Sequence, residues 1–361
     1  MKNKIIPVFI PHEGCPHDCS FCNQKKISGS VKSPSEDEIQ NQIEKYISTN
    51  RGDSNFTLAY YGGSFTAIEY DLQIKLLRLA KENLDMGKIQ NIRVSTRPDY
   101  LGEKNVKLLK EYSVGHVEIG IQSTDPYVLT LAKRFYGLGA VKDAVENLSN
   151  EKIAYGFQIM VGLPGDDKKR LLKTTFDLLG LGASTLRIYP CLVIKDTELE
   201  KSFYIGNYKP LDIEEAIELV KIPYIVFTSK NVPIIRTGLH SSESLGENGN
   251  IVAGPNHPAF GEMVTSSVIY DMICNLLDQR KPSTDLISIK CPSKMRSKVS
   301  GNKNLSILKL QERYNAKINL SSDENQKEIL IEYLSSSHKL DIKDYILDRA
   351  KKYESDYNIS R

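Results

Sequence analysis

The chain has 361 residues, of which 40% are hydrophobic and 26% are charged. These fractions are ordinary for a soluble globular protein, and the length predicts one large catalytic domain with one or two smaller units. The formal net charge of +3 is too small by itself to indicate a polyanionic partner. No apolar run reaches the length of a membrane span, so we expect no membrane partner.

Short strand patterns alternate with helical patterns through the first half of the chain. Segments rich in β-branched and aromatic residues predict strands at 5–10, 56–61, 91–96, 116–121, 154–161 and 185–189. Amphipathic patterns predict helices between them, at 35–47, 71–84, 103–111, 139–148 and 167–179. Six βα repeats predict an α/β fold, in which a parallel sheet closes wholly or partly into a (β/α)6 barrel.

A distinctive segment follows each of these six strands. In chain order the segments are the cysteine cluster, Gly62–Ser64, Ser95–Asp99, Gln122–Ser123, Gly162–Pro164 and Pro190–Cys191. The carboxyl ends of parallel strands meet on one rim, which is where barrels of this kind hold their active sites. The sequence therefore predicts an active site on that rim.

The pattern changes after Pro190. A helix is predicted at 213–227, a strand at 232–235, a helix at about 260–277 and a linker at 281–285. We therefore divide the chain into a core barrel (1–195), a barrel extension (196–284) and a small C-terminal α+β domain (285–361). His240 and His257 lie in loops rich in Gly, Pro and Ser, which often line sites. They are either substrate-side residues, and hence catalytic candidates, or structural turn residues.

The C-terminal domain has the predicted order β-α-loop-α-β-β-α, with its loop at Gly301–Asn304. This order looks like a KH domain, whose G-x-x-G loop clamps a nucleotide backbone. Asn304 stands in place of the last glycine. Eight basic residues and one acidic residue lie between Lys290 and Lys317, which suits contact with phosphates. Gly301, Lys303 and Asn304 are the RNA-binding candidates, and the alternative is a small structural cap with a solvated basic face.

Three of the six cysteines, Cys15, Cys19 and Cys22, have the spacing C-x3-C-x2-C. Thiolates are the usual ligands of iron–sulfur clusters, and three of them leave one iron of a cubane open, as catalytic metal sites require. A zinc site is the alternative, and it needs a fourth ligand such as His12 or His17.

The other three cysteines, Cys191, Cys274 and Cys291, are widely spaced, so no disulfide framework is evident. A metal site in a reducing cytoplasm is favoured over a secreted fold, and we expect a cytoplasmic protein. Cys274 and Cys291 fall in apolar patterns typical of the core. Cys191 follows the sixth strand, where it is either a buried spectator or a substrate-contacting or methyl-carrying thiol, and hence a catalytic candidate.

The cysteine motif, with an aromatic residue before its last cysteine, and the glycine pair after the second strand resemble the radical S-adenosylmethionine (radical SAM) superfamily. The resemblance covers roughly residues 5–200. It implies that a [4Fe–4S] cluster held by the three cysteines binds S-adenosylmethionine at its open iron. Electron transfer then cleaves the cofactor to a 5′-deoxyadenosyl radical, which implies a reductant such as flavodoxin or ferredoxin as a partner.

The resemblance also assigns cofactor-binding residues. Gly62, Gly63 and Ser64 match the segment whose backbone receives the methionine amino group, and glycine there lets the backbone approach the ligand. Arg134, with Lys133, corresponds to the basic group that meets the cofactor carboxylate; the alternative for this pair is a solvated surface. Ser95 stands where many members of the superfamily carry a glutamate. Further cofactor contacts are assigned to Phe21, Gln122, Gln158 and Gly162, with the two glutamines at the ribose hydroxyls.

Four segments are close to the radical domain of the Elongator catalytic subunit: Tyr61–Thr66, Thr96–Tyr100, Gly120–Thr124 and Leu186–Ile194. That family modifies a wobble uridine of transfer RNA. The resemblance therefore implies an RNA-modifying transferase with a tRNA or rRNA substrate, and we expect no acetyltransferase domain within this chain. The alternative is the porphyrin branch, either a coproporphyrinogen oxidase-like enzyme or a haem chaperone.

Overall fold

The computed structural model describes residues 2–10, 18–23, 33–239 and 249–360. The chain forms two compact units. The barrel unit consists of Met1–Asp212 and Val232–Asn256, and the C-terminal unit consists of Ile213–Asn231 and His257–Arg361. These limits do not coincide with the predicted boundaries at 195 and 284, and that three-part division stays a prediction. Within the described residues, no helix combines the length and the apolar character needed to cross a membrane.

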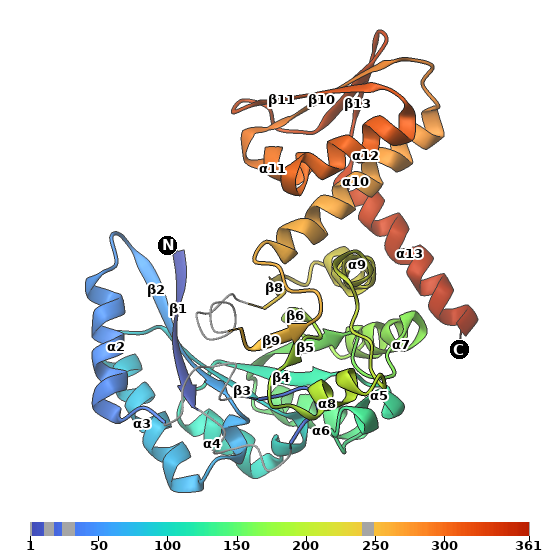
Figure 1. Cartoon of the computed structure of the whole chain (residues 1–361). Coiled ribbons are helices and arrows are strands. Elements are labelled where there is room, and N and C mark those ends of the chain that lie inside the picture. Colours follow the sequence, from blue (N-terminus) through green and yellow to red (C-terminus); the bar gives the residue numbers. More distant parts are fainter. Residues whose placement is uncertain (1, 11–17, 24–32, 240–248, 361) are drawn as a thin grey trace. The chain divides into compact units, whose positions relative to one another are not determined.

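The barrel unit is built on a curled sheet of seven parallel strands in the order β1-β2-β3-β4-β5-β6-β8 (Figure 1). Their bounds are Lys2–Ile10, Ser54–Gly62, Asn91–Thr96, His116–Gln122, Ala154–Val161, Thr185–Pro190 and Ile234–Thr237. All six predicted barrel strands are present. The predicted count was one short, because the strand expected at 232–235 hydrogen-bonds to the open edge of β6 and so joins the same sheet.

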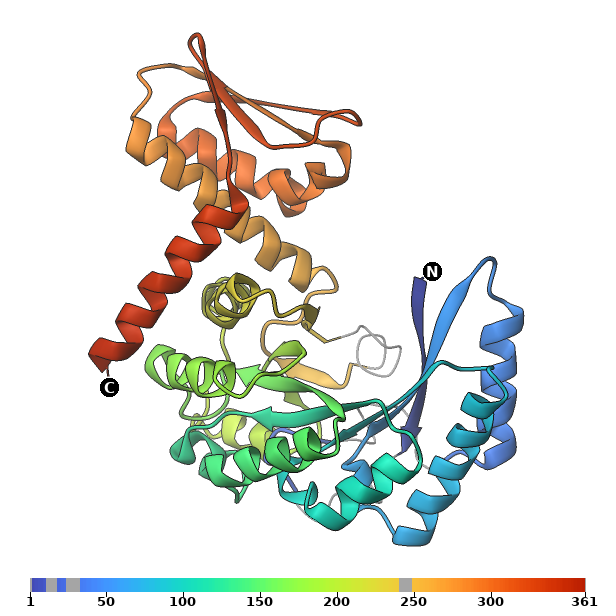
Figure 2. The same cartoon turned by 180° about the vertical axis from the view of Figure 1, so that it is seen from behind.

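Helices cover the outer side of this sheet (Figure 2). The helices of the barrel unit are α2 (Glu36–Ser48), α3 (Tyr70–Asp85), α4 (Glu103–Glu111), α5 (Pro126–Leu131), α6 (Leu138–Asn150), α7 (Lys168–Leu179) and α8 (Glu198–Tyr204). The predicted capping box begins α2: the Ser35 hydroxyl accepts from the Glu38 amide (3.2 Å), and the Ser35 amide donates to the Glu38 carboxylate (2.7 Å). Reciprocal capping of two free amides explains why this helix starts where it does.

Side-chain contacts distinguish the two faces of the sheet. On β2, the Tyr60 hydroxyl donates to the carbonyl oxygen of Leu76 in α3 at 2.7 Å, and its register partner on β3, Val94, is fully buried. Both residues therefore point toward the helix layer. Successive residues of a strand point to opposite faces. Tyr61 and Arg93 consequently lie on the inner face of the curled sheet, away from the helices.

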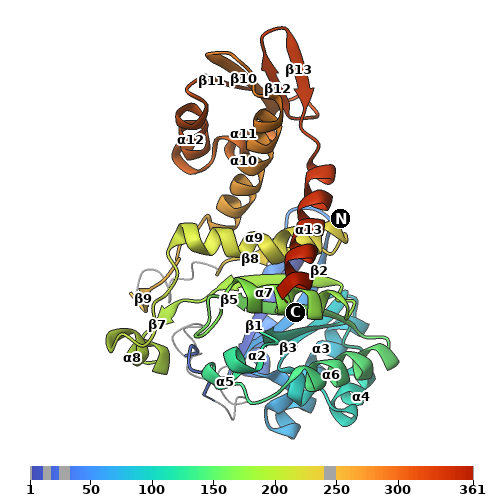
Figure 3. The same ribbon diagram turned by 90° about the vertical axis from the view of Figure 1, so that its right-hand side faces the viewer.

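The C-terminal unit has a separate sheet in the order β11-β10-β12-β13, in which β10 runs parallel to β11 and antiparallel to β12. Its strands are β10 (Leu286–Pro292), β11 (Lys317–Asp323), β12 (Leu330–Tyr333) and β13 (Ser336–Lys339). Its helices are α9 (Ile213–Ser229), α10 (Phe260–Arg280), α11 (Arg296–Ser300), α12 (Leu305–Tyr314) and α13 (Ile342–Ser360). Helices α9 and α13 pack side by side (Figure 3). Strand β13 was not predicted.

Candidate active site

The cysteine loop is tied to two helices of the barrel unit. The amide of Cys22 donates to the carbonyl oxygen of Cys19 at 3.0 Å, which closes a tight turn between two of the predicted cluster ligands. The neighbouring Ser20 amide donates to the carbonyl oxygen of Ala132, which follows α5 (3.1 Å). The Leu199 amide of α8 donates to the carbonyl oxygen of Ser20 (2.7 Å). These bonds fix the loop beside both helices. Cys15, the third predicted ligand, lies outside the described residues, as do His12 and His17.

Two guanidinium groups lie beside Cys19. Arg134 Nη1 is 3.3 Å and Arg97 Nη1 is 3.8 Å from the Cys19 sulfur. Asp99 holds Arg97 with two bonds, Nε–Oδ1 at 2.9 Å and Nη2–Oδ2 at 2.8 Å. Both guanidinium groups lie over the ring of Tyr136, at 5.4 and 5.2 Å from its centroid. The two cations would balance the negative charge of a thiolate-ligated cluster and attract an anionic ligand.

Sequence reasoning identified Arg134 but missed Arg97 and Tyr136. Arg134 is 5% exposed, and it also donates to the carbonyl oxygen of Gly120 in β4. A local signal for Arg97 was present, because the segment Arg97-Pro98-Asp99 places a carboxylate two residues after an arginine at the end of a strand. Lys133, by contrast, pairs with Glu198 of α8.

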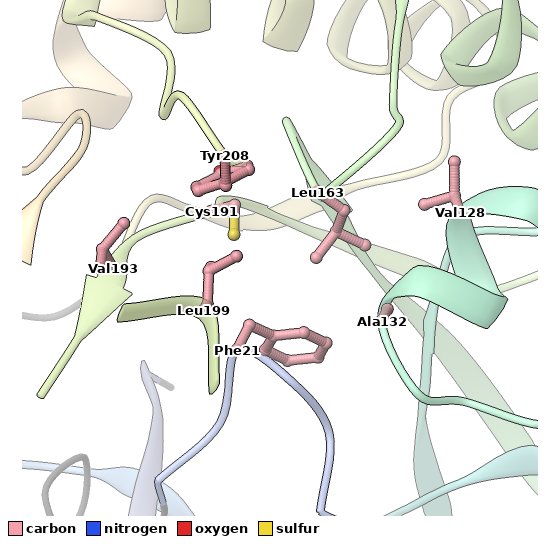
Figure 4. Packing of buried hydrophobic residues seen from close by; sticks show 8 residues of the cluster. All are labelled: Phe21, Val128, Ala132, Leu163, Cys191, Val193, Leu199 and Tyr208. Atoms are coloured by element: carbon pink, nitrogen blue, oxygen red, sulfur yellow. The ribbon is translucent and has the colours of Figure 1, made fainter. Parts of the chain in front are cut away.

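Phe21, on the cysteine loop, belongs to a cluster of buried hydrophobic residues (Figure 4). The cluster also contains Val128, Ala132, Leu163, Cys191, Val193, Leu199 and Tyr208, with Cys19 and Cys22 packed against it. The structure thus brings Cys191 into the neighbourhood of the predicted cluster ligands. Burial raises the pKa of the Cys191 thiol to about 12. The group is therefore a protonated thiol near neutral pH, which is a poor nucleophile.

The glycines on the rim are required by close backbone contacts. Gly62 has φ +116°, and a Cβ atom there would lie 2.3 Å from the carbonyl oxygen of Ile10. The Gly63 amide donates to the same oxygen at 3.2 Å, and Ser64 is 2% exposed. A side chain at position 62 would therefore force β1 and β2 apart. These contacts explain Gly62 by packing, and the role of Gly62–Ser64 in binding the cofactor stays a prediction.

Gln122 ends β4 at a register shift, with φ +71°. Its side chain is buried, and its Oε1 has no hydrogen-bond partner among the described residues. A buried acceptor without a donor costs free energy unless a ligand supplies one. A ribose hydroxyl is such a donor, so Gln122 fits the role that the resemblance gave it. Gln158 of β5 and Ser95 of β3 alternate with buried residues and lie half-buried on the inner face.

Gly162 follows β5, and its backbone is already engaged within the barrel unit. Its amide donates to Asp166 Oδ2 at 3.0 Å, and its carbonyl oxygen accepts from the Tyr208 hydroxyl at 2.7 Å. A Cβ atom at Gly162 would lie 2.5 Å from the Leu211 side chain. These contacts explain the glycine by packing, and its contact with the cofactor stays a prediction.

The remaining candidates lie in the C-terminal unit or outside the described residues. His257 Nδ1 accepts from the Ala259 amide (3.1 Å), and its Nε2 lies 3.4 Å from Asn302 Nδ2. The contact with Ala259 lies just before α10, which fits a structural turn residue, and a role of His257 on the substrate side stays a prediction. Gly301, Lys303 and Asn304 all have positive φ, at 72°, 51° and 62°, in the turn before α12, where Gly301 is buried and Lys303 and Asn304 are exposed. His240 lies outside the described residues.

Asp166 predicts a pH dependence of stability. Burial raises the pKa of this carboxyl to about 7, against the lowering effect of amide donors. The folded state therefore binds the proton more tightly than the unfolded state. Protonated Asp166 therefore contributes to the free energy of unfolding. This contribution is fully present below about pH 4 and is lost as the pH rises through about 7. Asp166→Asn keeps an acceptor oxygen for the Gly162 amide but does not ionise.

We therefore expect the melting temperature of Asp166→Asn to rise relative to that of the wild type as the pH increases from 5 to 8. Anaerobic thermal unfolding measures both temperatures. Asp143→Asn, which neutralises an exposed carboxyl on α6, is the matched control and should track the wild type. Parallel curves for wild type and Asp166→Asn across this range would contradict the assignment.

Comparison with known proteins identifies the family of this fold. Residues 9–178 match the model of the radical SAM superfamily, and residues 183–269 match the radical SAM C-terminal domain. An uncharacterised protein of Methanocaldococcus jannaschii is 30% identical over 234 residues, covering 61% of this chain and 71% of that protein. A tRNA uridine(34) acetyltransferase of the same organism is 28% identical over 261 residues, covering 60% of this chain.

Among solved structures, the archaeal Elp3 of Methanocaldococcus infernus superposes with a TM-score of 0.57 at 20% identity. The match covers 77% of this chain and 63% of that one, and it shows a shared fold. The chain spans 47% of the M. jannaschii acetyltransferase. Radical SAM enzymes bind a [4Fe–4S] cluster and S-adenosylmethionine, the two cofactors predicted from the sequence. On the family match and the coverage of its M. jannaschii relative, the chain belongs to the radical SAM superfamily.

Proposed function

We propose that this radical SAM enzyme modifies a base of an RNA, with transfer RNA as the first candidate. The RNA substrate is supported by relatives named tRNA uridine(34) acetyltransferase, which share its barrel region. The single observation that carries the radical chemistry is the pair of guanidinium groups within 3.8 Å of Cys19 Sγ. When bound, the two cofactors supply a radical that abstracts a hydrogen atom from the substrate.

The residues of this chain have distinct tasks in that reaction. Cys15, Cys19 and Cys22 hold the cluster, and Arg134 meets the carboxylate of S-adenosylmethionine. The backbone at Gly62–Gly63 accommodates its amino group, and Gln122 accepts from a ribose hydroxyl. The buried side chains around Phe21 exclude water from this region, which protects a reactive radical.

The reaction is tested with the anaerobically reconstituted full chain, a chemical reductant and total tRNA. We expect RNA to stimulate formation of 5′-deoxyadenosine and a new modified nucleoside to appear in the digested RNA. Modification profiling of RNA from cells with and without the protein then identifies the base. Tight stoichiometric binding of haem, with no effect of RNA on turnover, would instead support the porphyrin branch.

We also propose that the turn at Gly301–Asn304 contacts the RNA backbone. Lys303→Glu places a negative charge there and repels phosphate. RNA affinity should therefore fall, and the slope of log K against log salt should become shallower by about 1. The measurement is a fluorescence-anisotropy titration at several salt concentrations.

Lys327→Glu makes the same charge change at an exposed residue between β11 and β12, and serves as the control. Cluster content should be unchanged in both variants. If Lys303→Glu binds RNA as tightly as the wild type at every salt concentration, residues 285–361 act as a structural cap.

A further inference from the structure

A buried carboxylate, Glu118 of β4, holds two arginines on the inner face of the barrel sheet. Arg93 Nη1 of β3 lies 2.9 Å from Glu118 Oε1, and Arg187 Nε of β6 lies 3.4 Å from Oε2. Burial by itself would raise the pKa of Glu118, but the hydrogen bond from His116 and the two arginines outweigh it, and the pKa is lowered. Two arginines thus surround one carboxylate, so the group formed by Glu118, Arg93 and Arg187 carries a net positive charge.

Arg187 reaches across the curled sheet. Its Nη2 donates to the Tyr61 hydroxyl of β2 at 3.2 Å, and its Nη1 donates to the Tyr189 hydroxyl of β6 at 3.3 Å. Its guanidinium carbon lies 5.6 Å from the centroid of the Tyr61 ring. Three strands separate β2 from β6 in the sheet, so this contact exists because the sheet curls. The guanidinium is held in one orientation by Glu118 and the two hydroxyls.

An exposed aromatic ring lies next to Tyr61, the residue that Arg187 contacts. Phe9 of the edge strand β1 is 40% exposed, while its neighbours Val8 and Ile10 are 1% and 3% exposed. Phe9 therefore points to the inner face, where its ring centroid is 6.1 Å from that of Tyr61. Phe9 thus offers an exposed, flat apolar surface next to Tyr61, whose hydroxyl and ring are both contacted by the fixed guanidinium of Arg187.

We propose that Phe9, Tyr61 and Arg187 form a subsite for one unstacked nucleobase of the RNA substrate. The inference rests on the proposed function and deepens it. Single-stranded RNA is commonly recognised by stacking its bases on aromatic rings and guanidinium planes and by hydrogen bonds to base edges. The base stacks on Phe9, and Arg187 donates to its carbonyl oxygens, which suits the excess positive charge.

The position of this subsite agrees with its task. Tyr61 directly precedes Gly62 and Gly63, the pair assigned to S-adenosylmethionine, and both Tyr61 and Arg187 lie on the face that the sheet encloses. A base stacked there is held beside the predicted cofactor residues and away from the helix layer. Extruding a base into an enclosed site is the general solution for enzymes that act on bases.

The test compares Phe9→Ala and Arg187→Met with Tyr70→Ala, which removes an aromatic ring of matching exposure (42%) from α3 on the outer side of the sheet. Removing one stacking ring should reduce RNA-stimulated 5′-deoxyadenosine formation by roughly 10- to 100-fold. Cluster content and cofactor cleavage without RNA should match the wild type. Phe9→Tyr should restore most of the activity, because it restores the ring.

The second measurement locates the base directly. Transfer RNA carrying sparse 4-thiouridine is irradiated with the wild-type holoenzyme, and crosslinked peptides are identified by mass spectrometry. Crosslinks at residues 2–10 or 54–62 are expected. If RNA stimulates turnover but Phe9→Ala and Arg187→Met behave like Tyr70→Ala and crosslinks map elsewhere, the subsite is wrong and the RNA function stands. If RNA neither binds nor stimulates the wild type, both proposals fail.

Discussion

Replacing Cys19 or Cys22 with alanine is expected to abolish both the cluster and reductive cleavage of S-adenosylmethionine. Three thiolates hold one cubane, and two thiolates leave a second iron open and the cluster labile. The same loss is expected for Cys15→Ala. Iron and sulfide content, visible absorption and chromatographic detection of 5′-deoxyadenosine measure the effect after anaerobic reconstitution.

Cys291→Ala is the matched control, because Cys291 is a fully buried thiol of β10 in the other unit. It should retain the cluster and turnover at the wild-type level, even though removing a core sulfur lowers stability slightly. A triple variant of Cys15, Cys19 and Cys22 that keeps the visible absorption of the cluster would contradict the ligand assignment.

Arg134→Met is expected to weaken S-adenosylmethionine binding by roughly 10- to 100-fold, while most of the cluster is retained. A charge-assisted hydrogen bond to a carboxylate contributes about 1.5–3 kcal/mol, and the side chain of Arg134 is well shielded from solvent. The loss should appear as a higher Kd in equilibrium dialysis with labelled cofactor. Cluster absorption, recorded on the same samples, checks that the metal centre survives.

Lys133→Met distinguishes the two neighbouring basic residues. Lys133 is partly buried, and its 44% exposed side chain pairs with Glu198, so its replacement should change the Kd by less than about threefold. Arg134 also donates to the Gly120 carbonyl oxygen and the Tyr136 hydroxyl. Tyr136→Phe removes the second of these bonds but keeps the guanidinium, so it separates the structural role of Arg134 from its proposed role in cofactor binding. A loss for Lys133→Met as large as that for Arg134→Met would assign the cofactor carboxylate to Lys133.

Local sequence patterns predicted most of the elements that form the barrel. The alternation of strand and helix, the capping box before α2 and the cysteine spacing are all encoded within a few consecutive residues. The elements that were missed are short or polar. Strand β13 (Ser336–Lys339) has no apolar alternation, and α5 has six residues, although Asp125 before Pro126 is a recognisable helix start.

The candidate site residues also fall into those predicted from neighbouring residues and those that only long-range contacts revealed. Cys19, Phe21 and Cys22 were identified within one loop, and Gly62 was identified beside the end of its strand. The pairing of Arg97 with Asp99 is visible locally, but its contact with Cys19 was missed because the sulfur lies 78 residues away in the sequence. The contact between Arg187 and Tyr61 spans 126 residues. No local pattern specifies such a pair.

The sequence by itself determined the alternating elements, the position of the cysteine loop and the rim at the strand ends where Gly62, Gly63 and Gln122 lie. These features depend on periodicity and on neighbouring residues, which a single chain displays directly. Only the tertiary structure decided that β8 extends the sheet and that Arg97 joins Arg134 at Cys19. It also decided that Arg187 crosses the interior to Tyr61. Those outcomes depend on strand register and on how far the sheet curls, and both are set by the packing of the whole unit.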